Sequence, residues 1–205
     1  MERQLDPVEE KNLIDQMLAG DEAAFDQIYR LFHGPVFRFA VQMTGSRANS
    51  EEILQEVFLS LVQKGEAFDP GRGRLISCLY GIARNKINRS FSAGHWREKS
   101  LESEAPGILD HALAPDDPAA ELVRLEEIEN LRRGILSLPE RYREVVALCD
   151  LSEMSYEEAA DIIQCSIGTV RSRLHRGRTL LIEKMRATVR PAIQCGTARP
   201  ARGYL

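Results

Sequence analysis

Apolar residues recur at intervals of three and four along nearly the whole chain, the spacing that gathers them on one face of an α-helix. No segment alternates apolar and polar residues over the length of a strand, and the chain contains no Asn-Gly or Asp-Gly hairpin signal. The pattern therefore predicts an all-α protein.

The N-terminal half is predicted to hold five helices, separated by glycine and proline residues. The clearest break falls at Gly34-Pro35. Asn49 and Glu52 have the spacing of a capping box at the start of the fourth helix, whose apolar stripe extends to Val62. The predicted spans are 8–19, 21–34, 36–44, 49–64 and a fifth helix from about residue 74.

Helical periodicity fails between residues 99 and 118, where Pro106, Gly107, Pro115 and Pro118 interrupt an acidic stretch. This composition predicts a flexible linker, because it offers few apolar residues to a core. The predicted organisation is two small helical domains at 1–97 and 120–190, joined by the flexible acidic linker at 98–119 and followed by a disordered tail at 191–205.

The C-terminal domain contains a predicted helix-turn-helix. Ser155 and Glu158 have capping-box spacing at the start of a short helix that ends near Ile163. A turn at residues 164–166 then leads into a long basic helix, which should reach about Thr188. A short helix, a tight turn and a basic second helix are typical of a DNA-binding helix-turn-helix.

The second of these helices carries the candidates for DNA contact. Val170 and Leu174 lie four residues apart and are predicted to pack this helix onto the first, which turns its opposite side to solvent. Arginine can form bidentate hydrogen bonds to guanine, and hydroxyls at a helix N-terminus can reach phosphate. The alternative is a helical hairpin with a solvated basic face. The candidates for base contact are Arg171, Ser172, His175 and Arg176, and those for phosphate contact are Ser166 and Thr169.

The formal net charge is −4, but the charges are segregated along the chain. Residues 84–99 have a balance of +4 and residues 166–186 one of +5, whereas residues 98–129 have a balance of −8. Such patches act independently because salt screens charges over about 10 Å. Two basic patches on one chain therefore indicate two nucleic-acid contacts despite the acidic sum.

Several other classes of function are not supported by the sequence. No apolar run is long enough to span a membrane and no secretory signal is visible, so the expected location is the cytoplasm. The cysteines form no CxxC pair and no cluster with histidines, so neither a metal nor another cofactor is expected. Inert thiols are the favoured interpretation, with Cys149 and Cys165 the first pair to test for redox sensing. No nucleophile with a partnered base is apparent, so no catalytic residue is predicted.

Segments in both halves resemble the extracytoplasmic-function (ECF, group IV) sigma factors, the promoter-recognition subunits of bacterial RNA polymerase. Residues 51–59 resemble the family's polymerase-binding helix, and residues 79–85 resemble the helix that meets one promoter element. Residues 138–146, 155–160 and 168–176 together resemble the C-terminal promoter-binding domain. The resemblance covers about residues 20–186 and implies a sigma factor, not an enzyme.

The resemblance implies that the C-terminal domain reads the minus-thirty-five element as duplex, while the N-terminal domain captures the melted minus-ten strand. Phe91 and Trp96 are candidates for base stacking, the alternative being that either ring packs against its domain. Polar and basic side chains suited to the minus-ten strand are Arg84, Asn85, Lys86, Asn88 and Arg89.

The resemblance also implies partners: promoter DNA, and core RNA polymerase through the coiled coil of its largest subunit and the flap of its second-largest subunit. An anti-sigma factor, which can hold such a protein at the membrane, is a further implied partner, and no small-molecule substrate is implied. The linker would thread the RNA exit channel or serve as a solvated spacer, and a separate hypothesis folds it onto the basic patches. The implied polymerase contacts are Glu51, Glu52, Gln55 and Glu56.

Two residues depart from the family pattern. Cys78 stands where the family usually has tryptophan, and Gln164 stands where the turn often has glycine or asparagine. A positive φ at Gln164 would imply strain of about 1 kcal/mol or more.

Three rival functions are weighed against the resemblance. The first is a ligand-sensing helix-turn-helix regulator, which would dimerise, need a ligand pocket and bind duplex tightly by itself. The second is an enzyme, for which the sequence offers no nucleophile with a partnered base and no paired carboxylates beyond helix-surface acids. The third is an interaction protein that mimics a sigma factor without binding promoter DNA.

Overall fold

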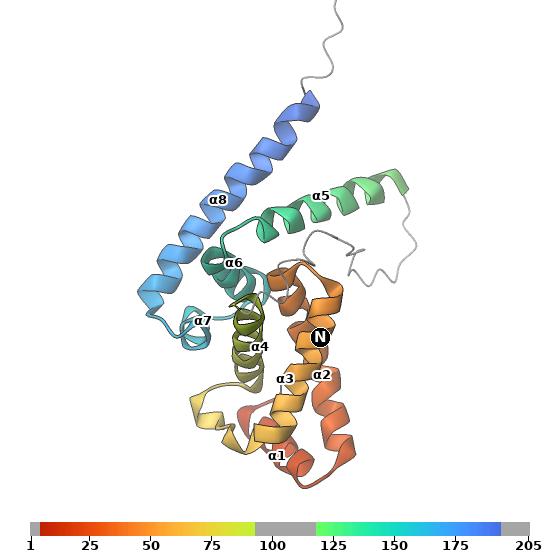
Figure 1. Cartoon of the computed structure of the whole chain (residues 1–205), viewed down its shortest axis with the longest axis vertical. Helices are drawn as coiled ribbons and strands as arrows, with labels where there is room; N and C mark the ends of the chain where they lie inside the picture. Colours follow the sequence, from red (N-terminus) through yellow and green to blue (C-terminus); the bar gives the residue numbers. More distant parts are fainter. Residues whose placement is uncertain (1–4, 93–117, 194–205) are drawn as a thin grey trace, which may run out of the picture.

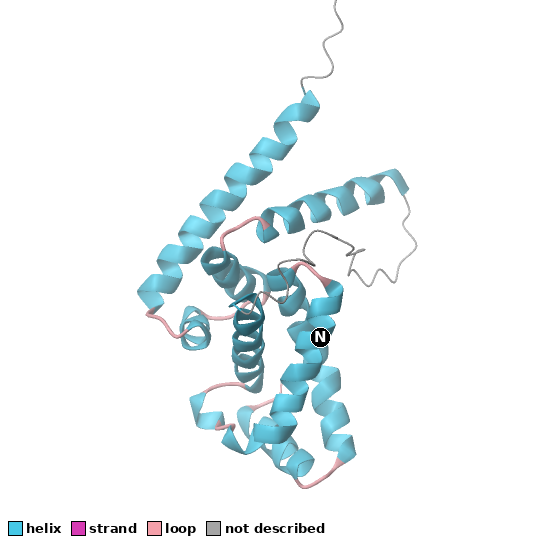
Figure 2. Cartoon of the chain, viewed as in Figure 1, coloured by secondary structure: helices cyan, strands magenta, loops and turns pink. Residues whose placement is uncertain are grey.

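The computed structural model describes residues 5–92 and 118–193, and every regular element within these ranges is helical (Figure 2). The all-α class is therefore confirmed. The N-terminal half (residues 5–92) holds α1 (Pro7–Leu18), α2 (Glu22–Thr44), α3 (Arg47–Lys64) and α4 (Leu75–Ser92), with short 3-10 turns at Gly65–Ala67 and Pro70–Arg72. The C-terminal half (residues 118–193) holds α5 (Pro118–Leu136), α6 (Glu140–Val146), a π-helical turn at Ala147–Leu151, α7 (Tyr156–Ile163) and α8 (Ile167–Ile193).

The core of the N-terminal half lies between α2, α3 and α4, and α1 packs against α2 (Figure 1). Phe39 of α2 is fully buried, and its ring centroid lies 5.0 Å from that of Tyr80 in α4. Ile53 and Val57 of α3 are buried at the four-residue spacing seen in the sequence. The apolar stripes of the three long helices therefore face one another, as an all-helical fold requires.

The predicted break at Gly34-Pro35 is wrong, because α2 continues through Pro35 as one helix. A proline inside a helix removes one hydrogen bond and costs about 3 kcal/mol. The same face of α2 is nevertheless buried on both sides of Pro35, through Ile28 and Phe32 before it and Val36 after it. Burial of a continuous apolar face offsets the local penalty, and the helix ends only at Gly45, whose φ is 70°.

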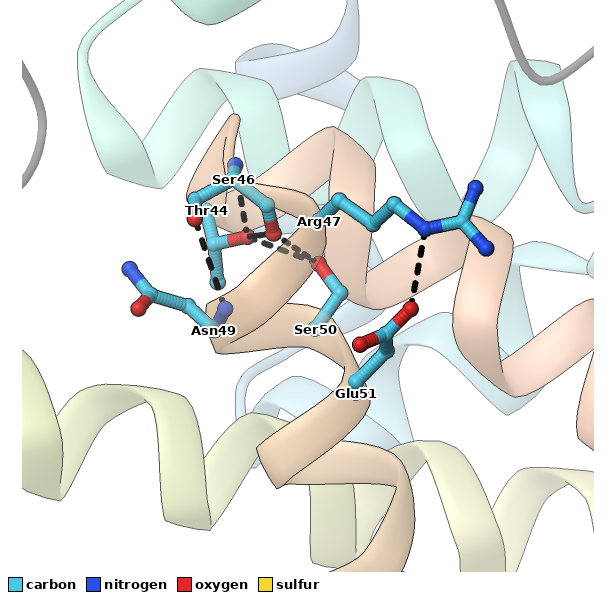
Figure 3. A network of polar contacts seen from close by, with 6 residues as sticks. All are labelled: Thr44, Ser46, Arg47, Asn49, Ser50 and Glu51. Carbon is cyan, nitrogen blue, oxygen red and sulfur yellow. Dashed lines mark hydrogen bonds and ion pairs between the residues drawn. The ribbon is translucent and has the colours of Figure 1, made fainter. Parts of the chain in front are cut away.

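The start of α3 is also different from its prediction. Ser46, not Asn49, caps this helix, because its Oγ accepts a hydrogen bond from the Asn49 backbone N at 3.3 Å (Figure 3). The Thr44 and Ser50 hydroxyls lie 2.9 Å apart, and Ser50 Oγ donates to the Ser46 carbonyl at 2.6 Å. The helix begins at Arg47, so Asn49 lies buried within its first turn and is not the cap that the sequence suggested.

Glu10 fixes the start of α4, which carries the minus-ten candidates. Its side chain is 1% exposed, and Oε2 accepts a hydrogen bond from the Leu75 backbone N at 2.7 Å. Burial raises the pKa of the Glu10 carboxyl, while the Leu75 hydrogen bond and the charge of Arg74 oppose that rise. A residue of α1 therefore satisfies a free N–H at the first turn of α4.

The C-terminal half is organised around α8, which packs against α5, α6 and α7. Gly177 is buried where α8 crosses α6, and a Cβ atom built there would lie 3.0 Å from Val146 Cγ2. The helix reaches Ile193, so the predicted end near Thr188 is wrong and residues 191–193 belong to α8. Pro191 is tolerated because, in the last turn, it removes only a hydrogen bond near a helix end.

The two halves contact each other directly. Helix α4 packs against α7, and α2 packs against α5, α6 and the Ala147–Leu151 turn. Beyond this body, α5 and α8 extend outward with their far ends separated (Figure 1). Predictions for the linker before residue 118, for Trp96 and for the tail after residue 193 lie outside the described residues.

Candidate nucleic-acid interface

The helix-turn-helix is formed by α7 and α8. The predicted capping box is present at α7: Glu158 backbone N donates to Ser155 Oγ at 3.2 Å, and Ser155 backbone N donates to Glu158 Oε2 at 2.9 Å. Ala159 and Ala160 are buried, as the close crossing of the two helices requires. Gln164 has a φ of 60°, so the positive φ considered from the sequence is realised at the turn.

The predicted division of α8 into a buried and an exposed side is confirmed. Val170 is 0% and Leu174 is 2% exposed, because both pack into the core of the C-terminal half. The opposite side of the helix faces solvent. It presents Arg171, Ser172, His175 and Arg176, all of which are exposed.

The hydroxyl groups at the start of α8 contact each other. Ser166 Oγ accepts a hydrogen bond from the Thr169 backbone N at 3.2 Å and lies 2.9 Å from Thr169 Oγ1. Ser172 Oγ in turn donates to the Thr169 carbonyl at 3.0 Å. Ser166 therefore caps α8 with its own side chain, and its exposed position at the positive end of the helix dipole remains suited to a phosphate.

Two contacts of α8 were not found by reasoning from the sequence. Arg178 Nε donates to Asp150 Oδ2 at 3.0 Å, and a second bond joins Arg178 Nη2 to the other carboxylate oxygen. The Arg171 guanidinium lies 5.7 Å from the centroid of the Tyr156 ring. Both partners are distant in sequence and carry no local signal. The fork between Arg178 and Asp150 joins α8 to the Ala147–Leu151 turn, next to its exposed face.

Cys149, one of the two cysteine candidates for redox sensing, has an environment that disfavours reactivity. Cys149 and Cys165 are half-buried and free, and Cys78 packs against the core where a larger ring was expected. Burial and the neighbouring Asp150 raise the pKa of the Cys149 thiol to about 11. Because the thiolate is the reactive species, Cys149 is held in its unreactive form at neutral pH.

The minus-ten candidates on α4 have different surroundings. Asn85 and Arg89 are exposed, while Asn88 is half-buried. Lys86 Nζ lies 3.1 Å from Glu56 Oε2 of α3, so a candidate for DNA is paired with a candidate for polymerase. Arg84 instead forms an ion pair with Glu144 of α6, and its side chain is only 19% exposed.

Phe91 lies near the end of α4. Its ring is half-buried and packs against the hydrophobic core, which agrees with the packing alternative and leaves part of the ring accessible. Its position follows the exposed Arg89 along the helix.

The polymerase-binding candidates lie on α3. Glu51, Glu52 and Gln55 are exposed and Glu56 is half-buried, with Glu51 Oε1 held 2.9 Å from Arg47 Nε (Figure 3). The same helix exposes apolar side chains that the sequence did not single out: Leu59 is 57% exposed. Val62, which was predicted to lie in the apolar stripe, is 45% exposed. Apolar side chains beside acidic ones on one helix surface are typical of a protein-binding face.

The described residues hold neither a cluster of metal ligands nor a helix that could span a membrane. No group of three or more His, Cys, Asp or Glu side chains lies close enough to hold a metal ion within the described ranges. Among the same residues, no helix combines the length and the apolar character that crossing a bilayer demands.

Comparisons with known proteins agree with this geometry. The family model for sigma-70 region 2 matches residues 28–98, and the model for sigma-70 region 4 matches residues 128–181. The ECF RNA polymerase sigma factor SigW of Bacillus subtilis is 30% identical over 189 residues, which cover 86% of this chain and 96% of that protein. The ECF sigma-E factor of Escherichia coli is 28% identical over 187 residues, covering 87% and 95%.

A solved structure is similar over most of the chain. The sigma factor RpoE from Bartonella quintana, crystallised with the anti-sigma factor NepR, superposes with a TM-score of 0.62 at 25% identity. The match covers 79% of this chain and 96% of that one. Region 2 coincides with α2–α4, and region 4 with the helix-turn-helix and its supporting helices. The chain therefore belongs to the family of ECF RNA polymerase sigma factors.

Proposed function

We propose that this chain is a group IV ECF sigma factor that binds core RNA polymerase and directs it to specific promoters. In this proposal, an N-terminal domain at 1–97 binds polymerase and the minus-ten element. The linker at 98–119 connects it to a domain at 120–190 that binds the minus-thirty-five element.

The observation that carries the proposal is the solvent-facing side of α8. Val170 and Leu174 fix the helix on α7, and Arg178 joins it to the Ala147–Leu151 turn through Asp150, so the recognition side chains project together from a rigid base. Arg171 and Arg176 supply planar donors for guanine in the major groove. Ser172 and His175 contribute shorter donors and acceptors, while Ser166 and Thr169 contact phosphate at the helix N-terminus.

Helix α4 supplies the contacts to the melted minus-ten strand. The arginine and lysine side chains Arg84, Lys86 and Arg89 hold the backbone, and Asn85 with Asn88 offers amide groups to unpaired bases. The exposed part of Phe91, together with Trp96, supplies stacking surface. A pocket for unstacked bases offsets the melting of the duplex, which costs about 1.4 kcal/mol per step.

Helix α3 binds the coiled coil of the largest polymerase subunit through Glu51, Glu52, Gln55 and Glu56. The exposed Leu59 next to these acids supports a protein partner at this surface. The C-terminal domain contacts the flap of the second-largest subunit. Because RpoE is similar and was solved with NepR, we also propose an anti-sigma partner, with the free protein in the cytoplasm or held at the membrane by that partner.

The proposal is tested by promoter selection from a randomised DNA library. Core polymerase reconstituted with this chain should enrich fragments that share two elements at a fixed spacing, and permanganate should detect unpaired thymines at the downstream element. The chain without polymerase should enrich little, because its basic patches alone give weak binding. Tight, specific duplex binding by the chain alone would favour a ligand-sensing regulator. Polymerase binding without DNA enrichment would favour a sigma mimic.

A further inference from the structure

One side of the helix that carries the minus-ten candidates is covered by the other half of the molecule. Helix α4 packs against α7, the first helix of the helix-turn-helix, and Arg84 of α4 forms an ion pair with Glu144 of α6 (Figure 1). A hollow of about 370 Å³ between the start of α4 and α7 is lined by Asn85 on one side and Asp161 on the other. An acidic side chain of one half and one nucleic-acid candidate of the other half thus line the same hollow.

The central contact is the ion pair between Arg84 and Glu144. Arg84 Nε donates to Glu144 Oε1, and the two side chains are 19% and 6% exposed. Burial raises the pKa of the Glu144 carboxyl, and the nearby charges of Arg84 and Arg173 oppose that rise. A buried carboxylate without a cation would be strongly unfavourable, so Glu144 needs Arg84 while the halves are together. Glu144 also attracts Arg173, a residue of the recognition helix.

The residue before Glu144 makes a second contact between the halves. Arg143 Nη1 donates to the carbonyl oxygen of Met43 at 2.7 Å, near the C-terminal end of α2. The other terminal nitrogen donates to the carbonyl oxygen of Leu138 at 3.0 Å and to that of Leu136. A cation suits the negative end of the α2 dipole. Consecutive residues of α6 therefore hold α2 and α4 at the same time.

A third region of contact joins the N-terminal and C-terminal halves. Tyr80 of α4 and Ser152, which directly follows the Ala147–Leu151 turn, line the same hollow between the two halves. At the end of α2, a Cβ atom built on Gly45 would lie 3.2 Å from the Leu136 side chain of α5. The interface is thus tightly packed and hydrogen-bonded, which indicates a defined arrangement of the two halves.

We infer that the free protein is autoinhibited: the two halves hold each other closed, and Glu144 takes the place of a DNA phosphate at Arg84. This inference rests on the proposed function of α4 as the minus-ten helix. Phosphate and carboxylate both accept hydrogen bonds from guanidinium, so the two compete for one side chain. Separation of the halves, as polymerase binds both domains, would release Arg84 to nucleic acid and expose the α7 side of α4.

The variant Glu144→Gln tests the inference, because it removes the charge and keeps nearly the same shape. Glu127→Gln is the matched control: it has the same change of charge, on an exposed residue of α5. We expect Glu144→Gln to bind a fluorescent single-stranded oligonucleotide at least about three-fold more tightly than Glu127→Gln does. The radius of gyration in small-angle scattering should also increase. Adding Arg84→Ala should abolish the gain in affinity.

A second variant keeps the inference testable if Glu144→Gln fails to fold. Arg143→Gln breaks the other contact and leaves Arg84 and Glu144 intact, and circular dichroism reports whether either variant keeps its helices. We expect Arg143→Gln to open the molecule as well. Equal affinity and equal scattering for wild type and the folded variants would overturn the inference. Transcription by the wild-type chain with core polymerase is measured in parallel, so that failure of the autoinhibition is distinguished from failure of the sigma-factor proposal.

Discussion

Gln164 adopts a left-handed backbone at the turn of the helix-turn-helix, with a φ of 60° and a ψ of 53°. For a residue with a Cβ atom, this conformation costs about 1–2 kcal/mol, whereas glycine adopts it freely. The side-chain amide compensates in part, since Gln164 Nε2 donates to the Asp161 carbonyl. The turn therefore combines strain with a local hydrogen bond.

We predict that Gln164→Gly raises the free energy of unfolding by about 1 kcal/mol, because relief of the strain exceeds the loss of one exposed hydrogen bond. Urea denaturation monitored by circular dichroism measures the change. Gln164→Ala is the control: it loses the same hydrogen bond and keeps the strain, so it should be less stable than wild type. If the glycine variant proved no more stable than the alanine variant, the turn would not be strained.

For some single residues the sequence predicted the structural environment, and for others it did not. The candidate strain at Gln164 and the exposure of Arg171 and Arg176 were predictable, because both follow from the local spacing of a helix-turn-helix. The cap of α3 was not. Asn49 and Ser46 both have suitable side chains, and the choice depends on which one remains outside the core.

At the scale of elements, the position of α8 depends on a glycine. A Cβ atom at Gly177 would lie 3.0 Å from Val146 Cγ2 and 3.4 Å from the Tyr142 carbonyl oxygen. The tight contact is the one with Val146, which is 2% exposed and has little room to move, whereas 3.4 Å is an ordinary van der Waals distance. Gly177 thus permits the close approach of α6 and α8 that supports the recognition helix.

We predict that Gly177→Ala lowers the free energy of unfolding by about 1–3 kcal/mol, the usual effect of overpacking, even though alanine favours helix formation. The matched control is Gly168→Ala in the same helix, where the nearest atom is Ser166 Oγ at 3.9 Å. That variant should be neutral or slightly stabilised. Thermal unfolding of the two variants measures the contrast, and equal stability would contradict the proposed contact.

The helical type of the elements followed from periodicity, but their number and ends followed only in part, since two helices predicted at 21–34 and 36–44 are the single helix α2. Pro35 was read as a break because local propensity disfavours proline within a helix, and the buried faces on both sides of it prevailed. Pro191 was read in the same way and lies inside α8. Whether the helix continues through each proline depends on tertiary packing at Pro35 and on the position near the helix end at Pro191. Neither factor can be recognised from the residues next to the proline.

At the scale of the molecule, the sequence predicted two helical domains and left their arrangement open. The contacts that join them are a buried ion pair between Arg84 and Glu144 and a bond from Arg143 to a backbone carbonyl. Such polar contacts join residues that are far apart in the sequence. They leave no regular spacing of residue types, so they cannot be predicted from a local pattern. The sequence analysis predicted Arg84 as a contact for the minus-ten strand, whereas in the folded chain its side chain is paired with Glu144 of the other half.

The central claim is that this sigma factor reads duplex promoter DNA with the exposed side of α8. The most direct measurement is run-off transcription with core polymerase on a selected promoter, comparing wild type with Arg171→Ala/Arg176→Ala. A control variant, Lys184→Ala/Arg186→Ala, removes the same charge from the end of the same basic patch, at positions that are not candidates for base contact and lie after the region 4 match ends at residue 181.

We predict a loss of run-off product of about ten-fold or more for Arg171→Ala/Arg176→Ala, since each bidentate contact to guanine contributes about 1–3 kcal/mol. The control should retain nearly all of its activity. Equal transcription by both variants, or an equal loss in both, would contradict the claim that the exposed side of α8 recognises promoter sequence.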